Sequence, residues 1–244
     1  MDIFQYSNKG GKEVNEDSAG YKVDQERSIF VVADGLGGHQ YGELSSACAV
    51  ESLLDEWKSA DIELGYQEQW IQDQVSAVNQ KILEMQAEYR SVIKTTFVAL
   101  LLNQGWAIWA NSGDSRLYYF HDRRLESVTE DHSVAYKKYK AGEITRDQIG
   151  KDEDQSSLLR SLGNKSRYEP DIHRSAGKIE PGDAFLLCTD GAWEYLRDEE
   201  IIIDLLKAES AREWTESLLL RIMSRIQGNN DNLTLLAIMI EPRG

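Results

Sequence analysis

At two places in the sequence, an apolar run leads to an aspartate that is followed directly by glycine. The run from Ile29 to Ala33 ends on Asp34 and the glycines of "DGLGG", and "LLCTDGAW" ends another run on Asp190. A glycine after such an aspartate allows the backbone carbonyl to turn inward as a further oxygen ligand, and magnesium and manganese prefer oxygen ligands. The pattern indicates a site for hard divalent cations, although a single Asp-Gly pair is more often only a turn.

Three more segments place acidic residues beside expected strands. "NSGDSRLYYF" puts Asp114 in a turn between two strands, and "GNNDNLTLLAIMI" puts Asp231 just before the last one. "VNEDSAG" puts Glu16 and Asp17 before an early strand. Because magnesium keeps several of its waters, a site with two ions needs only a few carboxylates, one of which can bridge.

The glycine-rich loop after Asp34 differs from two common ligand-binding loops. The glycines of "GLGGHQYG" are out of register with the dinucleotide pattern G-x-G-x-x-G, and an aspartate before the loop would repel a phosphate. The calcium pattern D-x-[DN]-x-[DN]-G does not occur in the sequence. Carboxylates gathered from several strand ends fit the sequence better than either loop.

Apolar periodicity predicts the elements that must position these carboxylates. Alternating or short apolar runs predict strands at 3–6, 19–23, 28–33, 95–102, 105–110, 116–120, 183–188 and 233–240. Helical periodicity predicts helices at about 42–59, 67–89, 198–207 and 211–226. Strands with hairpin-length connections form antiparallel sheets, and amphipathic helices cover sheet faces. Since no proline- or glycine-rich linker divides the chain, we expect one domain over residues 1–244.

The charged segment 133–165 interrupts this pattern. It is long for a connection within a compact domain, and such insertions are often functional lids. It also concentrates lysine and arginine on an otherwise acidic chain. A lid and a solvated helical face are both open interpretations of this segment.

Charge and composition limit the partners and the compartment. The net charge of −15 disfavours nucleic acid and anionic membrane surfaces as partners. No apolar window approaches the roughly 18 residues of a membrane span, and the first residues lack the pattern of a secretory signal. Cys48 and Cys188 lie in apolar segments and are predicted to be buried free thiols. We therefore expect a cytoplasmic protein.

Six motifs occur in the chain in this order: "NEDS", "VVADGLGGH", "GDSR", "TEDHS", "LLCTDGAW" and "NNDNLTLL". Their order and rough spacing resemble those of the metal-dependent Ser/Thr protein phosphatases of type 2C, in their bacterial single-domain form. The chain resembles this family from about Tyr6 to Ile240. The resemblance implies an α+β fold, a four-layer α/β/β/α sandwich with two central antiparallel sheets flanked by helix pairs and a flap at about 133–165. It also implies two or three Mg²⁺ or Mn²⁺ ions at one end of the sandwich.

The resemblance assigns roles to the residues of these motifs. Asp34 resembles the carboxylate that bridges two ions, and Gly35 resembles the residue whose carbonyl binds one of them. Asp190 and Asp231 resemble the remaining ligands of the other ion. Asp114 resembles a ligand of a third, weaker ion.

Two further residues of the resemblance concern water and substrate. Asp17 of "NEDS" resembles a carboxylate that orients water at the ions. Lys12 stands where family members usually carry an arginine that grips the substrate phosphate; lysine keeps the charge but loses the planar two-pronged grip. Lys12 as an ordinary surface lysine is the alternative. The general acid that some relatives place directly after the bridging Asp-Gly is not expected at His39 or His132.

The resemblance implies hydrolysis of phosphoserine and phosphothreonine in proteins by a metal-activated water, without a phospho-enzyme. The expected partners are phosphorylated proteins, the products of a Ser/Thr kinase, and neither nucleic acid nor a membrane. Two alternatives stay open: an enzyme for one dedicated partner, such as an antagonist of a sigma factor, and a binding module that recognises phosphoproteins without turnover. The complete set of aspartates disfavours the binding module, whereas Lys12 keeps it open.

Overall fold

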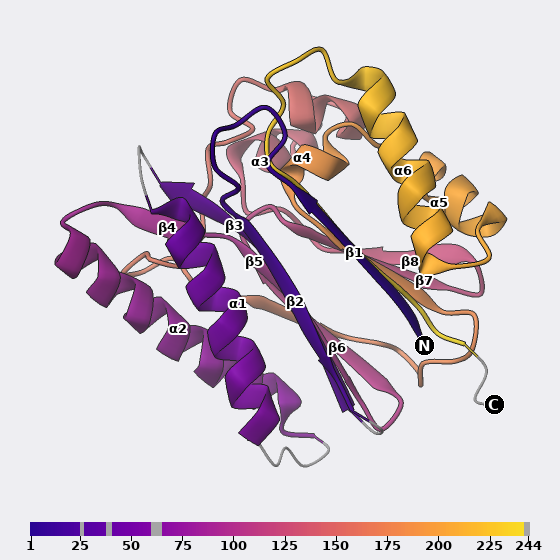
Figure 1. Cartoon of the computed structure of the whole chain (residues 1–244), viewed down its shortest axis with the longest axis horizontal. Coiled ribbons are helices and arrows are strands. Elements are labelled where there is room, and N and C mark those ends of the chain that lie inside the picture. The colour runs from indigo at the N-terminus through magenta and orange to yellow at the C-terminus, as the bar shows by residue number, and fades with distance from the viewer. Residues whose placement is uncertain (25–26, 38–40, 60–64, 242–244) are drawn as a thin grey trace.

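Two antiparallel sheets lie face to face at the centre of the computed structural model, which describes residues 1–24, 27–37, 41–59 and 65–241 (Figure 1). The first sheet contains, in spatial order, β1 (Asp2–Asn8), β11 (Leu233–Met239), β10 (Ala184–Cys188), β7 (Arg116–His121) and β8 (Arg124–Val128). The second contains β2 (Asp17–Val23), β3 (Arg27–Gly37), β5 (Phe97–Asn103), β6 (Trp106–Ser112) and β9 (Asp171–Arg174), with β4 (Ile93–Thr95) paired to β3.

Helix pairs cover the outer faces of both sheets. The second sheet packs against α1 (Gly42–Ser59) and α2 (Gln67–Tyr89), and the first against α5 (Asp198–Lys207) and α6 (Ala211–Arg225) (Figure 1). The prediction of a four-layer α+β sandwich is confirmed. No helix within the described residues is long and apolar enough to cross a membrane.

The burial of both faces of β3 explains why the sequence of this strand is a continuous apolar run. Phe30 and Val32 pack between the two sheets, whereas Ile29, Val31 and Ala33 pack against the helices on the outer face. Because both faces of the strand are covered, alternation of apolar and polar residues is lost. The strand leads from this apolar core to Asp34 and continues to Gly37 beside β4.

Strand boundaries differ from the predictions where hydrogen bonds to β3 interrupt the pattern. The expected strand at 95–102 is two strands, β4 and β5, that meet at Thr96. The Thr96 amide donates to the Asp34 carbonyl at 2.9 Å, and the Asp34 amide donates to the Thr96 hydroxyl at 3.0 Å. The break therefore holds the backbone of Asp34 at a fixed place.

Two strands and three short helical segments were not predicted. β8 and β9 are short and polar and lie at sheet edges, where little apolar surface is needed. Within 133–165 lie α3 (Val134–Lys140) and the 3₁₀ helix η1 (Arg146–Lys151), and "LLCTDGAW" contains the one-turn helix α4 (Asp190–Trp193). Helical periodicity cannot reveal helices of one or two turns.

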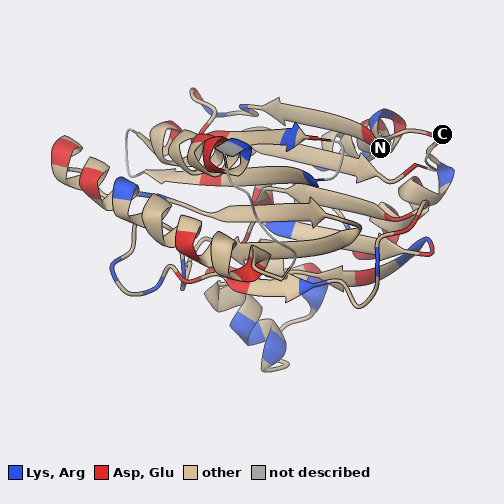
Figure 2. Ribbon diagram, turned by 90° about the horizontal axis from the view of Figure 1, so that it is seen from below, with Lys and Arg blue, Asp and Glu red and all other residues tan. Residues whose placement is uncertain are grey.

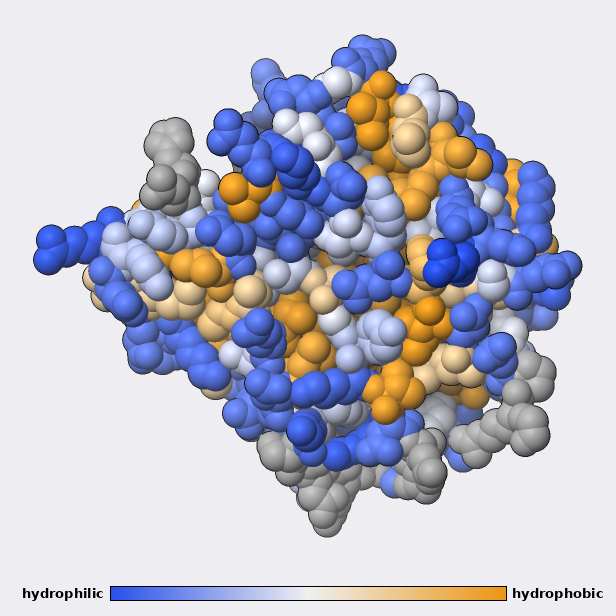
Figure 3. Space-filling view, in the orientation of Figure 1, coloured by the Kyte–Doolittle hydropathy of each residue, from blue (hydrophilic) through white to orange (hydrophobic). Residues whose placement is uncertain are grey.

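The surface reflects the same layering. Figure 2 shows charged residues mainly on helices and loops, with few on the strands. α6 leaves Leu220 and Met223 exposed, at 70% and 67% of their surface, in a part of the molecule where Figure 3 shows apolar side chains. Cys188 is buried as predicted, whereas Cys48 is partly exposed; both thiols are free.

Candidate metal centre

The aspartates of the sequence motifs lie at one end of the sandwich and come from both sheets. Asp17 opens β2 and pairs in register with Asp34 of β3, in the second sheet. Asp190 follows β10, and Asp231 precedes β11, both in the first sheet. Asp114 lies in the turn that leads from β6 in the second sheet to β7 in the first. The strand order thus delivers all five aspartates to one place.

Asp34 and Asp190 join the two sheets directly. Burial and the charge of Asp190 raise the pKa of Asp34 well above its usual value, and Asp17, Asp114 and Asp231 add to the effect. Burial and the charge of Asp231 also raise the pKa of Asp190, while a hydrogen bond with the Asp34 carboxyl group opposes this rise. These carboxylates, of which Asp34 and Asp190 are half-buried, therefore repel one another.

Asp17 carries an unsatisfied acceptor. Its side chain is buried, and Oδ2 accepts a hydrogen bond from the Thr189 hydroxyl at 2.8 Å. Oδ1 is buried and has no hydrogen-bond partner among the described residues. Burial raises the pKa of Asp17 to about 7, against the lowering effect of hydrogen bonds from Thr234 and Thr189. A buried carboxylate oxygen without a donor is a ready acceptor for a water or a cation.

Asp114 is held by a buried aromatic and ionic cluster. The Trp193 indole donates to the Asp114 carbonyl at 2.9 Å, and the Arg116 guanidinium stacks 3.6 Å from the centre of the Trp193 ring. Arg116 also binds both oxygens of Asp131, at 2.8 and 2.7 Å. Burial and the charge of Asp190 raise the pKa of Asp114 well above its usual value. Trp193 belongs to α4 with Asp190, so this cluster fixes two of the aspartates together.

Gly35 lies where two loops approach β3. A Cβ atom at this position would lie 2.1 Å from the Gly42 carbonyl oxygen and 2.7 Å from that of Glu16. The Gly35 amide donates to the Glu16 carbonyl at 3.0 Å. The close packing thus requires glycine here. Glu16 accepts a hydrogen bond from the amide of Gly42 at the start of α1, so its carboxylate caps that helix.

Lys12 reaches the centre through an ion pair. Its ammonium group lies 3.0 Å from Oδ2 of Asp231, and both side chains are about half exposed. Burial lowers the pKa of Lys12, but the hydrogen bond and charge of Asp231 outweigh it and leave the pKa raised. This ion pair places the ammonium group of Lys12 beside an aspartate of the cluster.

Asn232 positions the loop that carries Lys12, and the sequence motifs did not reveal this role. Its amide nitrogen donates to the carbonyls of Lys9 and Val14 at 2.9 and 3.0 Å, and its Oδ1 accepts from the Glu16 amide at 2.8 Å. The signal available in the sequence is its place directly after Asp231.

The donor set fits hard divalent cations that retain part of their water. Within the described ranges, no three histidine, cysteine, aspartate or glutamate side chains are arranged so that they could hold a metal ion by themselves. Asp17 and Asp34 pair in register, and the charges of Asp190, Asp114 and Asp231 act on Asp34. Magnesium is usually bound through one or two carboxylates and several waters, so paired oxygens and the free Oδ1 of Asp17 suit it.

His132 lies outside this donor set. The Nδ1 atom of His132 accepts from the Gly113 amide at 3.2 Å, and its Nε2 atom lies 3.0 Å from Asp171. His132 therefore organises the turn that contains Asp114. His39 lies outside the described residues.

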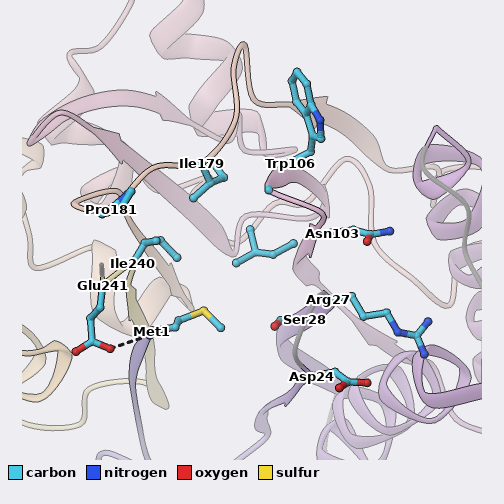
Figure 4. A pocket seen from close by; sticks show the side chains of 12 residues that line it. Met1, Asp24, Arg27, Ser28, Asn103, Trp106, Ile179, Pro181, Ile240 and Glu241 are labelled. Atoms are coloured by element: carbon cyan, nitrogen blue, oxygen red, sulfur yellow. Dashed lines mark ion pairs between the residues drawn. The ribbon is translucent and has the colours of Figure 1, made fainter. Parts of the chain in front are cut away.

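A separate cavity of about 280 Å³ opens at the other end of the sandwich (Figure 4). Its lining includes Met1, Arg27, Trp106 and Ile240, which lie at strand ends opposite to those that carry the aspartates. The amino group of Met1 forms an ion pair with Glu241 at 2.7 Å beside it. None of the five aspartates lines this cavity.

The comparisons with known proteins agree on one family. The model of the family protein phosphatase 2C matches residues 5–225. The serine/threonine phosphatase stp of Listeria monocytogenes is 31% identical over 230 residues, which cover 92% of this chain and 89% of that protein. The protein phosphatase PhpP of Streptococcus pneumoniae is 29% identical over 205 residues, 82% of each chain.

Solved structures extend the likeness to the whole fold. The serine/threonine phosphatase Stp1 of Staphylococcus aureus matches with a TM-score of 0.87 at 26% identity and covers 99% of this chain and 96% of that one. The phosphatase PstP/Ppp of Mycobacterium tuberculosis matches with a TM-score of 0.83 at 25% identity and covers 98% of each. With its two-sheet fold and its cluster of aspartates, the chain belongs to the protein phosphatase 2C family and is a metal-dependent protein serine/threonine phosphatase.

Proposed function

We propose that the chain hydrolyses phosphoserine and phosphothreonine in proteins at the aspartate cluster, with two or three Mg²⁺ or Mn²⁺ ions. Asp34, Asp190, Asp231 and the carbonyl of Gly35 would hold two ions, and Asp114 would hold a third. The observation that carries this assignment is the convergence of aspartates from both sheets: Asp17 pairs in register with Asp34, and Thr189, the neighbour of Asp190, donates to Asp17 at 2.8 Å. Buried carboxylates that raise one another's pKa call for a cation.

The ions, when bound, would lower the pKa of water and neutralise charge on the phosphoryl oxygens. The protein's own groups would orient the reactants around them. Asp17 presents its free Oδ1 to a water, while Thr189 holds its Oδ2. Lys12, now on Asp231, offers a positive charge to the phosphate of the substrate.

Direct attack by water agrees with the setting of the two cysteines. Burial raises the pKa of the Cys188 thiol within β10, so it is a poor nucleophile. Burial likewise raises the pKa of Cys48, which lies on α1. We therefore propose a reaction without a covalent phospho-enzyme.

The remaining assignments concern the organisation and setting of the enzyme. We propose one catalytic domain over residues 1–244 with a flap at about 133–165, acting in the cytoplasm on the products of a Ser/Thr kinase. The net charge of −15 supports the proposal that neither nucleic acid nor a membrane is a partner. The contact between Gln155 and Asp190 supports the proposal that the segment 133–165, which contains α3 and η1, acts as a flap at the aspartate cluster.

The test is turnover of p-nitrophenyl phosphate and of a phosphothreonine peptide by chelator-treated protein, with MnCl₂ or MgCl₂ added back. We expect turnover of both substrates only with metal, and a fall of more than about 100-fold for Asp34→Asn. A wild-type protein that binds Mn²⁺ without turnover would support a phosphoprotein-binding module instead. Rapid quench with labelled peptide would contradict the direct reaction if it trapped a phosphorylated protein.

A further inference from the structure

The segment 133–165 touches the aspartate cluster through Gln155. This side chain is buried, and its Nε2 atom donates to Oδ2 of Asp190 at 3.1 Å. The Ser156 hydroxyl donates to Gln155 Oε1 at 2.9 Å, which fixes the direction in which the amide points. A residue 35 positions away in sequence thus orients one carboxylate of the centre.

Lys138 holds the turn that carries Gln155. From α3, its ammonium group pairs with Asp152 and Asp154, both at 2.8 Å. The Asp154 amide also donates to the Asp152 carboxylate at 2.9 Å, and the Gln155 amide donates to the Asp152 carbonyl at 3.0 Å. These bonds link Lys138 to Asp190 through one turn of four residues.

Hydrogen bonds on both sides of the segment keep this turn in place. The Val134 amide donates to the Ser157 carbonyl at 3.0 Å, and the Leu159 amide donates to the His132 carbonyl at 2.7 Å. The start of α3 and the stretch after Gln155 are therefore tied together. A change in Lys138 would therefore reach Gln155 through this small hydrogen-bonded unit.

We propose that Gln155 is a positioning residue for Asp190 and that Lys138 acts on the same carboxylate through the 152–155 turn. The proposal rests on the assignment of Asp190 as a metal ligand. Partners of a ligand fix its orientation, and their loss typically weakens metal binding by about 10- to 100-fold. The fold of the segment would thereby set the affinity of the centre for its ions.

The test compares three variants in chelator-treated protein by calorimetric titration with MnCl₂ and by kinetics with p-nitrophenyl phosphate. Gln155→Leu removes the donor, and we expect Mn²⁺ binding to weaken about tenfold. Lys138→Met should weaken it roughly two- to fivefold, since it loosens the turn without removing the amide. Lys137→Met is the control. It removes the same charge from the preceding position of α3, where the side chain is exposed, and this variant should bind Mn²⁺ like the wild type.

Because p-nitrophenyl phosphate is small, its turnover separates an effect on the position of Asp190 from an effect on the attraction of phosphoproteins. With saturating Mn²⁺, Gln155→Leu should regain most of its turnover, so that the half-saturating Mn²⁺ concentration changes far more than KM. Unchanged Mn²⁺ affinity in Gln155→Leu would overturn the proposal, as would equal effects of Lys137→Met and Lys138→Met. Thermal melting without metal shows whether Gln155→Leu folds; if it does not, the two lysine variants decide. Failure of the proposed function would show in the wild type, as absent turnover, and not in the comparison of variants.

Discussion

Asp17, the first residue of β2, and Asp34 of β3 face each other in register across the antiparallel pair of strands. Like charges placed opposite each other on adjacent strands destabilise a sheet. The protein keeps this arrangement in a buried place, where Asp190 adds a third carboxylate. The metal-free protein should therefore hold protons that these groups would lose in water.

The first prediction concerns pH and stability without metal. Burial raises the pKa of Asp17 to about 7, from 3.8, so the folded protein binds a proton that the unfolded chain has lost between these values. Where the folded state binds more protons, the free energy of unfolding falls as pH rises. In chelator, the melting temperature of the wild type should fall between pH 4 and 7 more steeply than that of Asp17→Asn. Equal slopes for the two proteins would contradict this prediction.

The second prediction separates activity from stability at Asp34. Asp34→Asn removes a ligand of the proposed ions, so turnover should fall by more than about 100-fold. The same change removes charge repulsion with Asp190 and Asp17, so the melting temperature in chelator should stay equal or rise. Added Mn²⁺ should stabilise the wild type much more than the variant. A variant that loses stability in chelator and keeps the stabilisation by Mn²⁺ would disprove the assignment.

The third prediction concerns Lys12 and the phosphate. Lys12→Met removes the charge next to Asp231, and KM for p-nitrophenyl phosphate should rise roughly tenfold with a smaller change in kcat. Lys12→Arg restores the charge and adds the two-pronged grip, so its KM should be at or below that of the wild type. If both variants keep the KM of the wild type, Lys12 does not contact the phosphate.

The fourth prediction concerns the buried ion pair behind Asp114. Asp131→Ala leaves the buried guanidinium of Arg116 without its partner, which should lower the free energy of unfolding by about 3–5 kcal/mol. The double variant Asp131→Leu with Arg116→Met removes both charges and should recover a large part of this loss. Urea unfolding measures both. A double variant less stable than Asp131→Ala would show that the pair itself, and not the unpaired charge, carries the effect.

Periodicity predicted the long elements well because their faces are set by burial. The helices at 42–59, 67–89 and 198–207 have the predicted bounds, and each buries a stripe that repeats with the helical period. The strand at 95–102 was predicted as one because Thr96 has no pattern that marks its hydrogen bonds to Asp34. That break depends on a strand more than sixty residues away.

The residues of the site likewise divide into those that a sequence pattern marks and those whose role depends on a partner distant in sequence. The aspartates could be named from motifs, since each ends or precedes an apolar run. Thr189, Asn232 and Gln155 could not be assigned their roles, because an uncharged polar side chain acquires a role only through its partner in space. Thr189 binds Asp17, and Gln155 binds Asp190, over 172 and 35 positions of sequence.

Because the aspartates come from both sheets, the geometry of the centre depends on how the two sheets are aligned. A slip of one sheet against the other by one residue, about 3.3 Å, would separate Asp34 from Asp190. The apolar layer between the sheets, with Phe30, Leu187 and Leu236, opposes such a slip. Selection for dephosphorylation would thus also preserve the packing of side chains that no phosphoprotein ever touches.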